Sequence, residues 1–110
     1  MTTHKLRILV DRLYLKTMDG SLRWDESPEE NTFQAVFPEQ SISITSSREG
    51  ANLIVYDSTG RIITSCSSSE MFTFDAGTAN SLTQLFKMAR DNALGVDTKL
   101  DKLLSDLNQL

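Results

Sequence analysis

Residues 41–66 read "SISITSSREGANLIVYDSTGRIITSC", and this stretch decides the fold because three strand-like runs follow one another with only short turns between them. "SISIT" alternates isoleucine with hydroxyl residues, "NLIVY" is a continuous apolar run, and "RIITSC" closes the series. Parallel strands need a crossover of roughly a dozen residues or more, so "SSREG" and "DSTG" can join only antiparallel neighbours. The stretch predicts an antiparallel meander in which "NLIVY" is a central strand, covered on both faces.

The residues before this stretch predict one more strand and a leading helix. "TFQAVF" at 32–37 alternates apolar and polar residues and reaches the meander through "PEQ". Leu22 and Trp24 also alternate with other residues, which indicates either a fifth, edge strand or an extended connection. Apolar residues recur at helical spacing over residues 3–18, and Gly20 is suited to end that helix. We interpret the single tryptophan, Trp24, as a lid on the core, with a ligand contact as the alternative.

The residues after the stretch predict two helices. Ser81, with a glutamine three residues later, fits a capping box that starts the first helix, and Gly95 ends it. Asp97 can cap the second helix, whose leucines continue the apolar spacing as far as Leu110. Residues 67–80 carry no clear pattern, so both a short strand and a loop stay open for them.

Together these elements predict a single α+β domain over residues 1–110. It has an N-terminal helix, an antiparallel meander of four strands, with a fifth as the open alternative, and two C-terminal helices packed on one face of the sheet. The last helix carries more leucine than a two-layer fold needs. It either adds a third cover to the core or seals a symmetric homodimer, since isologous dimers are the commonest oligomers.

Composition argues against several classes of protein. The chain has 110 residues, of which 39% are hydrophobic and 24% charged, as in one globular domain. No apolar run approaches the roughly 20 residues of a membrane span, so we expect no membrane contact. The net charge of −4 disfavours nucleic acid, which binds basic surfaces. The single cysteine, Cys66, rules out an intramolecular disulfide, and we expect a cytoplasmic protein.

The residues that catalysis and metal binding require do not occur in suitable groups. Zinc needs several cysteine or histidine ligands, whereas the chain has one of each, Cys66 and His4, far apart in sequence. A Ser-His-Asp triad would have to use His4, which lies close to the N-terminus. No glycine-rich phosphate-binding motif is present. We therefore expect no metal and no cofactor, and we interpret Cys66 as a buried or half-buried small hydrophobe. Enzymatic activity stays open as the least favoured option, in a pocket on the Ser/Thr-rich sheet face.

Two hypotheses of function remain. The first is a non-enzymatic protein-interaction or regulatory module, homodimeric, whose contact surface is the edge formed by Leu103, Leu107 and Leu110, with the acidic loop at Glu29 and Glu30 as a second surface. The alternative is a small-ligand domain that binds a nucleotide or another anion on the Ser/Thr-rich sheet face. Its predicted binding residues are Arg48, Tyr56 and Arg61, because arginine makes bidentate contacts with anions and tyrosine can stack on a base.

Three phrases of the sequence, "TFQAVFP", "LIVYDSTGRII" and "LFKMARDNALGVDTKLDKLLSDL", resemble parts of small uncharacterised prokaryotic proteins. Those proteins share a leading helix, a central meander and an ending of the same pattern. The resemblance covers most of the chain, but it consists of packing residues without a catalytic motif. It implies a fold of the kind described above and no particular activity.

Overall fold

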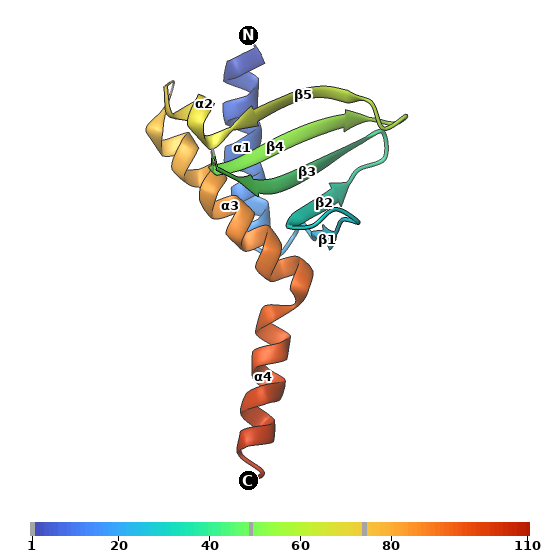
Figure 1. Ribbon diagram of the computed structural model, residues 1–110, viewed down its shortest axis with the longest axis vertical. Helices are drawn as coiled ribbons and strands as arrows, with labels where there is room; N and C mark the ends of the chain where they lie inside the picture. The colour runs from blue at the N-terminus through green and yellow to red at the C-terminus, as the bar shows by residue number, and fades with distance from the viewer. Residues whose placement is uncertain (1, 49, 74) are drawn as a thin grey trace.

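The protein was analysed as a computed structural model that describes residues 2–48, 50–73 and 75–110. Its elements are α1 (Thr2–Met18), β1 (Asp25–Glu26), β2 (Thr32–Val36), β3 (Gln40–Ser47), β4 (Gly50–Asp57), β5 (Ile62–Ser67), α2 (Ser68–Phe72), α3 (Ala76–Leu94) and α4 (Val96–Leu107). The five strands form one antiparallel sheet in the order β1-β2-β3-β4-β5 (Figure 1). The predicted α+β class and the meander are confirmed, and β1, directly after Trp24, is the fifth strand.

One face of the sheet forms the core. A row of apolar side chains crosses four strands in register, formed by Phe33, Ile44, Leu53 and Cys66. Ile44 and Leu53 have no exposed surface. Because side chains alternate between the faces of a strand, the residues between them point to the other face. The period-two pattern of the sequence thus becomes one apolar and one hydroxyl-rich face.

No helix of the described residues covers the hydroxyl-rich face, because α1 and α3 both lie on the apolar side (Figure 1). Ile54, from the apolar run "NLIVY", points to this face between Ser43 and Ser65 and is half-buried. The prediction that this strand is covered on both faces is therefore wrong. Its cross-strand neighbours shield Ile54 in part, which allows an apolar residue there without a covering layer.

Trp24 joins the two covering helices. Its side chain is 2% exposed and packs in the core with Val10 and Leu13 of α1 and with Leu85 of α3. The indole Nε1–H donates to Thr17 Oγ1 of α1 at 2.9 Å, and the Trp24 backbone N–H donates to Asn92 Oδ1 of α3 at 2.7 Å. The interpretation of Trp24 as a core lid is confirmed.

The segment between the sheet and α3 is helical rather than a strand or loop. Ser67 accepts from the Glu70 backbone N–H and starts α2, which ends at Phe72. Asp75 then accepts from the backbone N–H groups of Gly77 and Thr78 and starts α3. The prediction of a helix start at Ser81 is wrong, since the aspartate lies upstream and satisfies the free N–H groups first.

The terminal helix α4 does not lie on the sheet. Gly95 adopts the left-handed conformation, with φ of 63°, and it both ends α3 and precedes α4. Beyond this bend α4 projects from the body of the molecule (Figure 1), and none of its residues is buried. The prediction of two C-terminal helices on the sheet face is wrong for α4, because α1 and α3 already fill that face.

No helix in the described part of the chain has the length and apolar character that a membrane span requires.

The bond between Trp24 and Thr17 generates a stability prediction. Thr17→Val keeps the shape of the side chain but leaves the buried indole N–H without an acceptor, so we expect unfolding to become easier by about 1–3 kcal/mol. Urea unfolding followed by Trp24 fluorescence measures this change. Thr17→Ser retains the hydroxyl and is the control, and equal stability of the valine and serine variants would contradict the role of the bond.

Candidate functional site

The outstanding surface of the molecule is an apolar stripe on α4. Four leucines recur along one side of this helix and are 53–60% exposed: Leu100, Leu103, Leu104 and Leu107. Val96 begins the row, and Leu110 follows it beyond the helix end, fully exposed. We call these six residues the α4 stripe. The predicted contact residues Leu103, Leu107 and Leu110 belong to it, and the sequence prediction omitted Val96, Leu100 and Leu104.

A hollow on the body continues the stripe. It has a volume of about 420 Å³ and lies where α1, α3 and α4 meet, lined by Thr17, Met18, Met88, Asp91, Asn92, Val96, Asp97 and Leu100. Val96 and Leu100 belong to the α4 stripe, so the apolar surface runs from the projecting helix onto the body. Met18 is 58% exposed at its wall. We call this cavity the methionine hollow.

Sequence reasoning missed the methionine hollow because its residues come from three separate helices. One signal was present, since Met18 is an apolar residue off the main stripe of the first helix. Methionine is flexible and polarizable, and exposed methionines are common on surfaces that bind other proteins. Met18, Met88, Val96 and Leu100 give the hollow an apolar part, and Asp91 and Asp97 border it.

The other side of α4 is polar. Lys102 donates to Asp106 Oδ1 at 3.2 Å, one turn apart, and both side chains are exposed. Exposed pairs of this kind contribute little to stability, so they do not by themselves hold the helix together. With leucines on one side and charges on the other, α4 is an amphipathic helix.

The acidic loop forms a separate surface. Glu29 and Glu30 are exposed in the turn between β1 and β2. Both line a hollow of about 360 Å³ that Arg90 and Leu94 of α3 also border. This part of the molecule combines carboxylates with an arginine, which makes it less one-sided in charge than the sequence suggested.

The hydroxyl-rich sheet face contains the second candidate site. Ser43 Oγ and Tyr56 OH lie 3.1 Å apart, and Thr32 Oγ1 donates to Thr45 Oγ1 at 3.2 Å. A hollow of about 290 Å³ lies over this face, lined by Ser27, Glu29, Thr32, Gln34, Ser41, Ile42, Ser43, Tyr56 and Gly60. Its described lining carries one carboxylate and no cation, which suits an uncharged polar molecule better than an anion.

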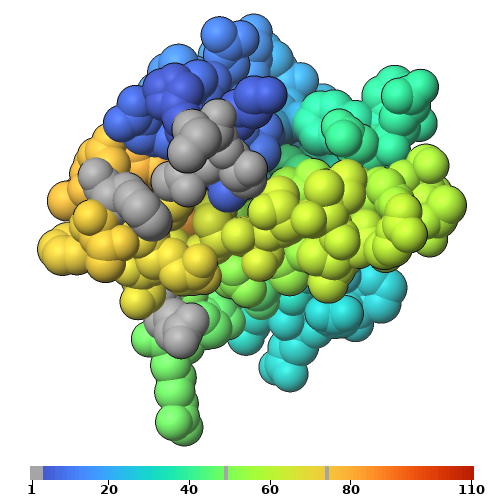
Figure 2. Space-filling model, turned by 90° about the horizontal axis from the view of Figure 1, so that it is seen from above, coloured from blue at the N-terminus to red at the C-terminus, as the bar shows by residue number. Residues whose placement is uncertain are grey.

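The structure does not bring the three predicted binding residues together. Tyr56 pairs with Ser41 near one end of β3, whereas Arg48 follows Ser47 at the other end, roughly 20 Å away along the strand. Seen from above, the end of β3 lies at the lower left of the body, and the β4–β5 turn forms the right-hand end (Figure 2).

Arg61 lies in the turn nearer to Tyr56 but contacts a local carboxylate. Its Nε donates to Asp57 Oδ2 at 3.2 Å, and its side chain is 82% exposed. Hydrogen bonds, first from Thr59 and then from Arg61, lower the pKa of Asp57. Asp57 Oδ1 also accepts from the backbone N–H groups of Thr59 and Arg61, so this charged group stabilises the β4–β5 turn.

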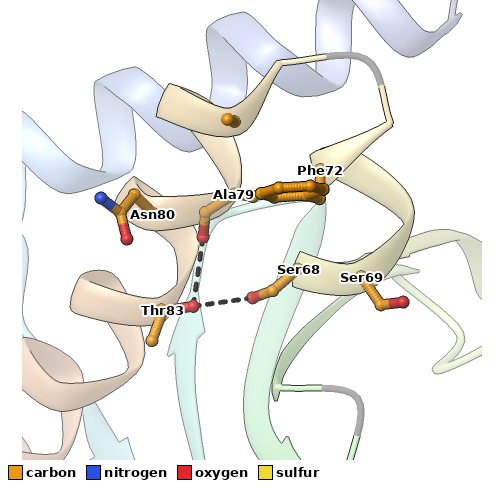
Figure 3. Close-up of a pocket in the computed structure, with 7 residues that line it drawn as sticks. Ser68, Ser69, Phe72, Ala79, Asn80 and Thr83 are labelled. Atoms are coloured by element: carbon orange, nitrogen blue, oxygen red, sulfur yellow. Dashed lines mark hydrogen bonds between the residues drawn. The ribbon is translucent and has the colours of Figure 1, made fainter.

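A further hollow, of about 390 Å³, lies between α2 and α3 (Figure 3). Ser68 Oγ and Thr83 Oγ1 point toward each other at 3.0 Å, and Thr83 Oγ1 donates to the Ala79 carbonyl at 3.1 Å. Ser68 Oγ also accepts from the Ala51 N–H of β4 at 3.2 Å. These hydroxyls tie α2, α3 and β4 together. None of the described residues that line the hollow is ionisable, so the lining offers no base to activate a serine.

Cys66 and His4 lie in separate environments. The Cys66 thiol is 2% exposed, and burial together with the nearby charge of Glu70 raises its pKa to about 11. It therefore stays protonated near neutral pH, which agrees with its interpretation as a small hydrophobe. His4 is exposed on α1, where its Nδ1 lies 3.2 Å from Arg7. Within the described ranges, no three metal-binding side chains form a group that could hold an ion.

Comparisons with protein-family models, with curated proteins and with solved structures find no match to this chain. The resemblance to small prokaryotic proteins therefore stays a prediction, and the candidate sites rest on geometry alone.

The buried thiol gives a prediction about reactivity and pH. At pH 8 we expect Cys66 to react with a thiol reagent ~100-fold more slowly in the folded protein than in the urea-unfolded chain, because each unit of pKa lowers the thiolate fraction tenfold. The unfolded thiol loses its proton near its ordinary value of 9.0 and the folded one near about 11, so the free energy of unfolding falls as pH rises between these values. Cys66→Ala should remove that part of the fall, and equal reaction rates in both states would contradict the burial.

Proposed function

We propose that the protein is a non-enzymatic interaction or regulatory module of the cytoplasm that forms a homodimer through the α4 stripe. The observation that carries the proposal is the projection of α4, with its leucines more than half exposed and none of its residues buried. The buried protonated thiol of Cys66 is compatible with a reducing compartment.

The exposed stripe supports a partner for thermodynamic reasons. A helix of 12 residues without tertiary packing is only marginally stable in water, since isolated helices need about 12–15 residues even when alanine-rich. Covering apolar surface contributes about 25 cal/mol for each square ångström removed from water. A partner that buries the leucines therefore stabilises the helix and gains affinity from the same contact.

The polar groups of the body support a role without catalysis. Ser68, Thr83 and Asp57 each take part in hydrogen bonds that fix a helix or a turn. Cys66 is protonated and buried, so it is a poor nucleophile. The polar groups of these residues thus make contacts within the fold, whereas the leucines of the α4 stripe are not buried in it.

A small-ligand function is the second candidate. It is favoured by the hollow over the hydroxyl-rich sheet face, where Ser43, Tyr56 and Gln34 converge. The test is thermal unfolding with a panel of nucleotides and uncharged polar metabolites. A ligand at a hundredfold its Kd adds about 2.7 kcal/mol of stability, and Tyr56→Phe should reduce that gain. A panel without any stabilisation would count against this function.

The homodimer proposal predicts a change in mass. Light scattering over a series of concentrations should show the average mass rising toward twice the 12.3 kDa of one chain. Leu107→Asp should keep the mass at one chain, because it places a charge in the centre of the contact, and this costs several kcal/mol when the charge has no partner.

Ser105→Asp is the matched control, since it adds the same charge to α4 outside the α4 stripe and should leave the mass unchanged. A one-chain mass for the wild type at every concentration would contradict the homodimer. Equal loss of association in both variants would show that the effect does not come from the α4 stripe.

A further inference from the structure

We infer that the partner of α4 is the α4 of a second copy in antiparallel orientation, with the partner's Leu110 seated at the methionine hollow. This inference rests on the proposed function and specifies its geometry. The first observation is the spacing within the α4 stripe. Steps of four and three residues alternate along Val96, Leu100, Leu103, Leu107 and Leu110. This spacing is the one that forms the apolar seam between two paired helices.

The charges beside the seam select the orientation. Lys99 and Asp106 are seven residues apart, two turns along the same edge of the seam, and both are exposed. The other edge carries Asp97 and Leu104. In an antiparallel pair, each edge faces the same edge of the partner, so Lys99 of each copy lies opposite Asp106 of the other. Symmetry produces this contact twice.

A parallel pair offers no such match. There each edge faces the opposite edge of the partner, and Lys99 would lie beside a leucine, the partner's Leu104. Asp106 has an intrahelical contact with Lys102 at 3.2 Å, which is exposed and contributes little. It can therefore turn toward Lys99 of a second copy without a large cost.

The register of the antiparallel pair brings the partner's Leu110 to the methionine hollow. When Lys99 faces the partner's Asp106, Leu100 packs on the partner's Leu103, and Val96 packs on the partner's Leu107. The partner's Leu110, which follows the end of α4, then lies beyond Val96 at the Gly95 bend, where Asn92 and Val96 both line the hollow. The seam alone covers only about two heptads, and the contact with Met18 and Met88 extends it onto the body.

Charge substitutions test the orientation. Lys99→Asp and Asp106→Lys should each weaken the dimer about tenfold in Kd, since each replaces two attractive pairs by two repulsive ones. A one-to-one mixture of the two variants should recover the wild-type affinity, because an acidic edge then faces a basic edge. The double variant Lys99→Asp/Asp106→Lys should also recover it. Each recovery should weaken as salt is added, because exposed pairs are screened.

Ser105→Asp and Asp101→Lys add an acidic and a basic side chain on the outer side of α4, at positions without a contact to Lys99 or Asp106 in the seam, and are the controls. They should leave the Kd within about twofold of the wild type. If the wild type dimerises and loses its dimer on Leu107→Asp, but mixing does not restore affinity, the antiparallel orientation is wrong and the proposed function stands. If the wild type never dimerises, both fail.

The seat of Leu110 has its own test. Met18 and Leu15 are both 58% exposed on α1, but only Met18 lines the methionine hollow. Met18→Asp should weaken the dimer about tenfold or more, because a carboxylate would meet an apolar side chain. Leu15→Asp should leave the Kd unchanged. Equal effects of the two variants would overturn the contact between Leu110 and the hollow.

Discussion

The sheet offers its helices a single apolar face, which α1 and α3 cover together with Met71 of the short helix α2. Trp24 completes this packing, since its indole N–H bonds to Thr17 of α1 and its backbone N–H bonds to Asn92 of α3. Phe33 of β2 contacts Phe86 of α3 with ring centroids 5.8 Å apart, so α3 packs directly on the apolar face of the sheet. The left-handed turn at Gly95 then directs α4 away from the body.

This constraint divides the molecule into a body and a projecting arm. The body uses its hydroxyls, its thiol and most of its apolar side chains for its own stability. The arm carries leucines on one side and charges on the other, in a helix too short to be stable without packing. The methionine hollow joins the two parts, because Val96 and Leu100 of the arm and Met18 of the body line it together. The proposed function, recognition by surface contact, rests on this division.

The sequence predicted the strands well because short turns such as "DSTG" allow only antiparallel neighbours. It predicted the leucine stripe of the last helix but not its position, since the same spacing suits a helix on its own core and one on a partner. The helix start at Ser81 was wrong because local capping patterns compete and Asp75 caps first. Arg48 and Tyr56 were grouped by composition, whereas the pairing of Tyr56 with Ser41 places them at opposite ends of β3. The methionine hollow depends on helices far apart in sequence, which no local pattern reports.

Amide hydrogen exchange along α4, measured over a dilution series, tests the central claim most directly. If the arm is stabilised by a second copy, protection of residues 98–107 should rise with protein concentration, while the amides of α3 in the body keep the same protection throughout. Protection of α4 that stays the same down to the lowest concentration would show a helix stable by itself. Full exposure of its amides at the highest concentration would show that no second copy covers it, and either result would contradict the account.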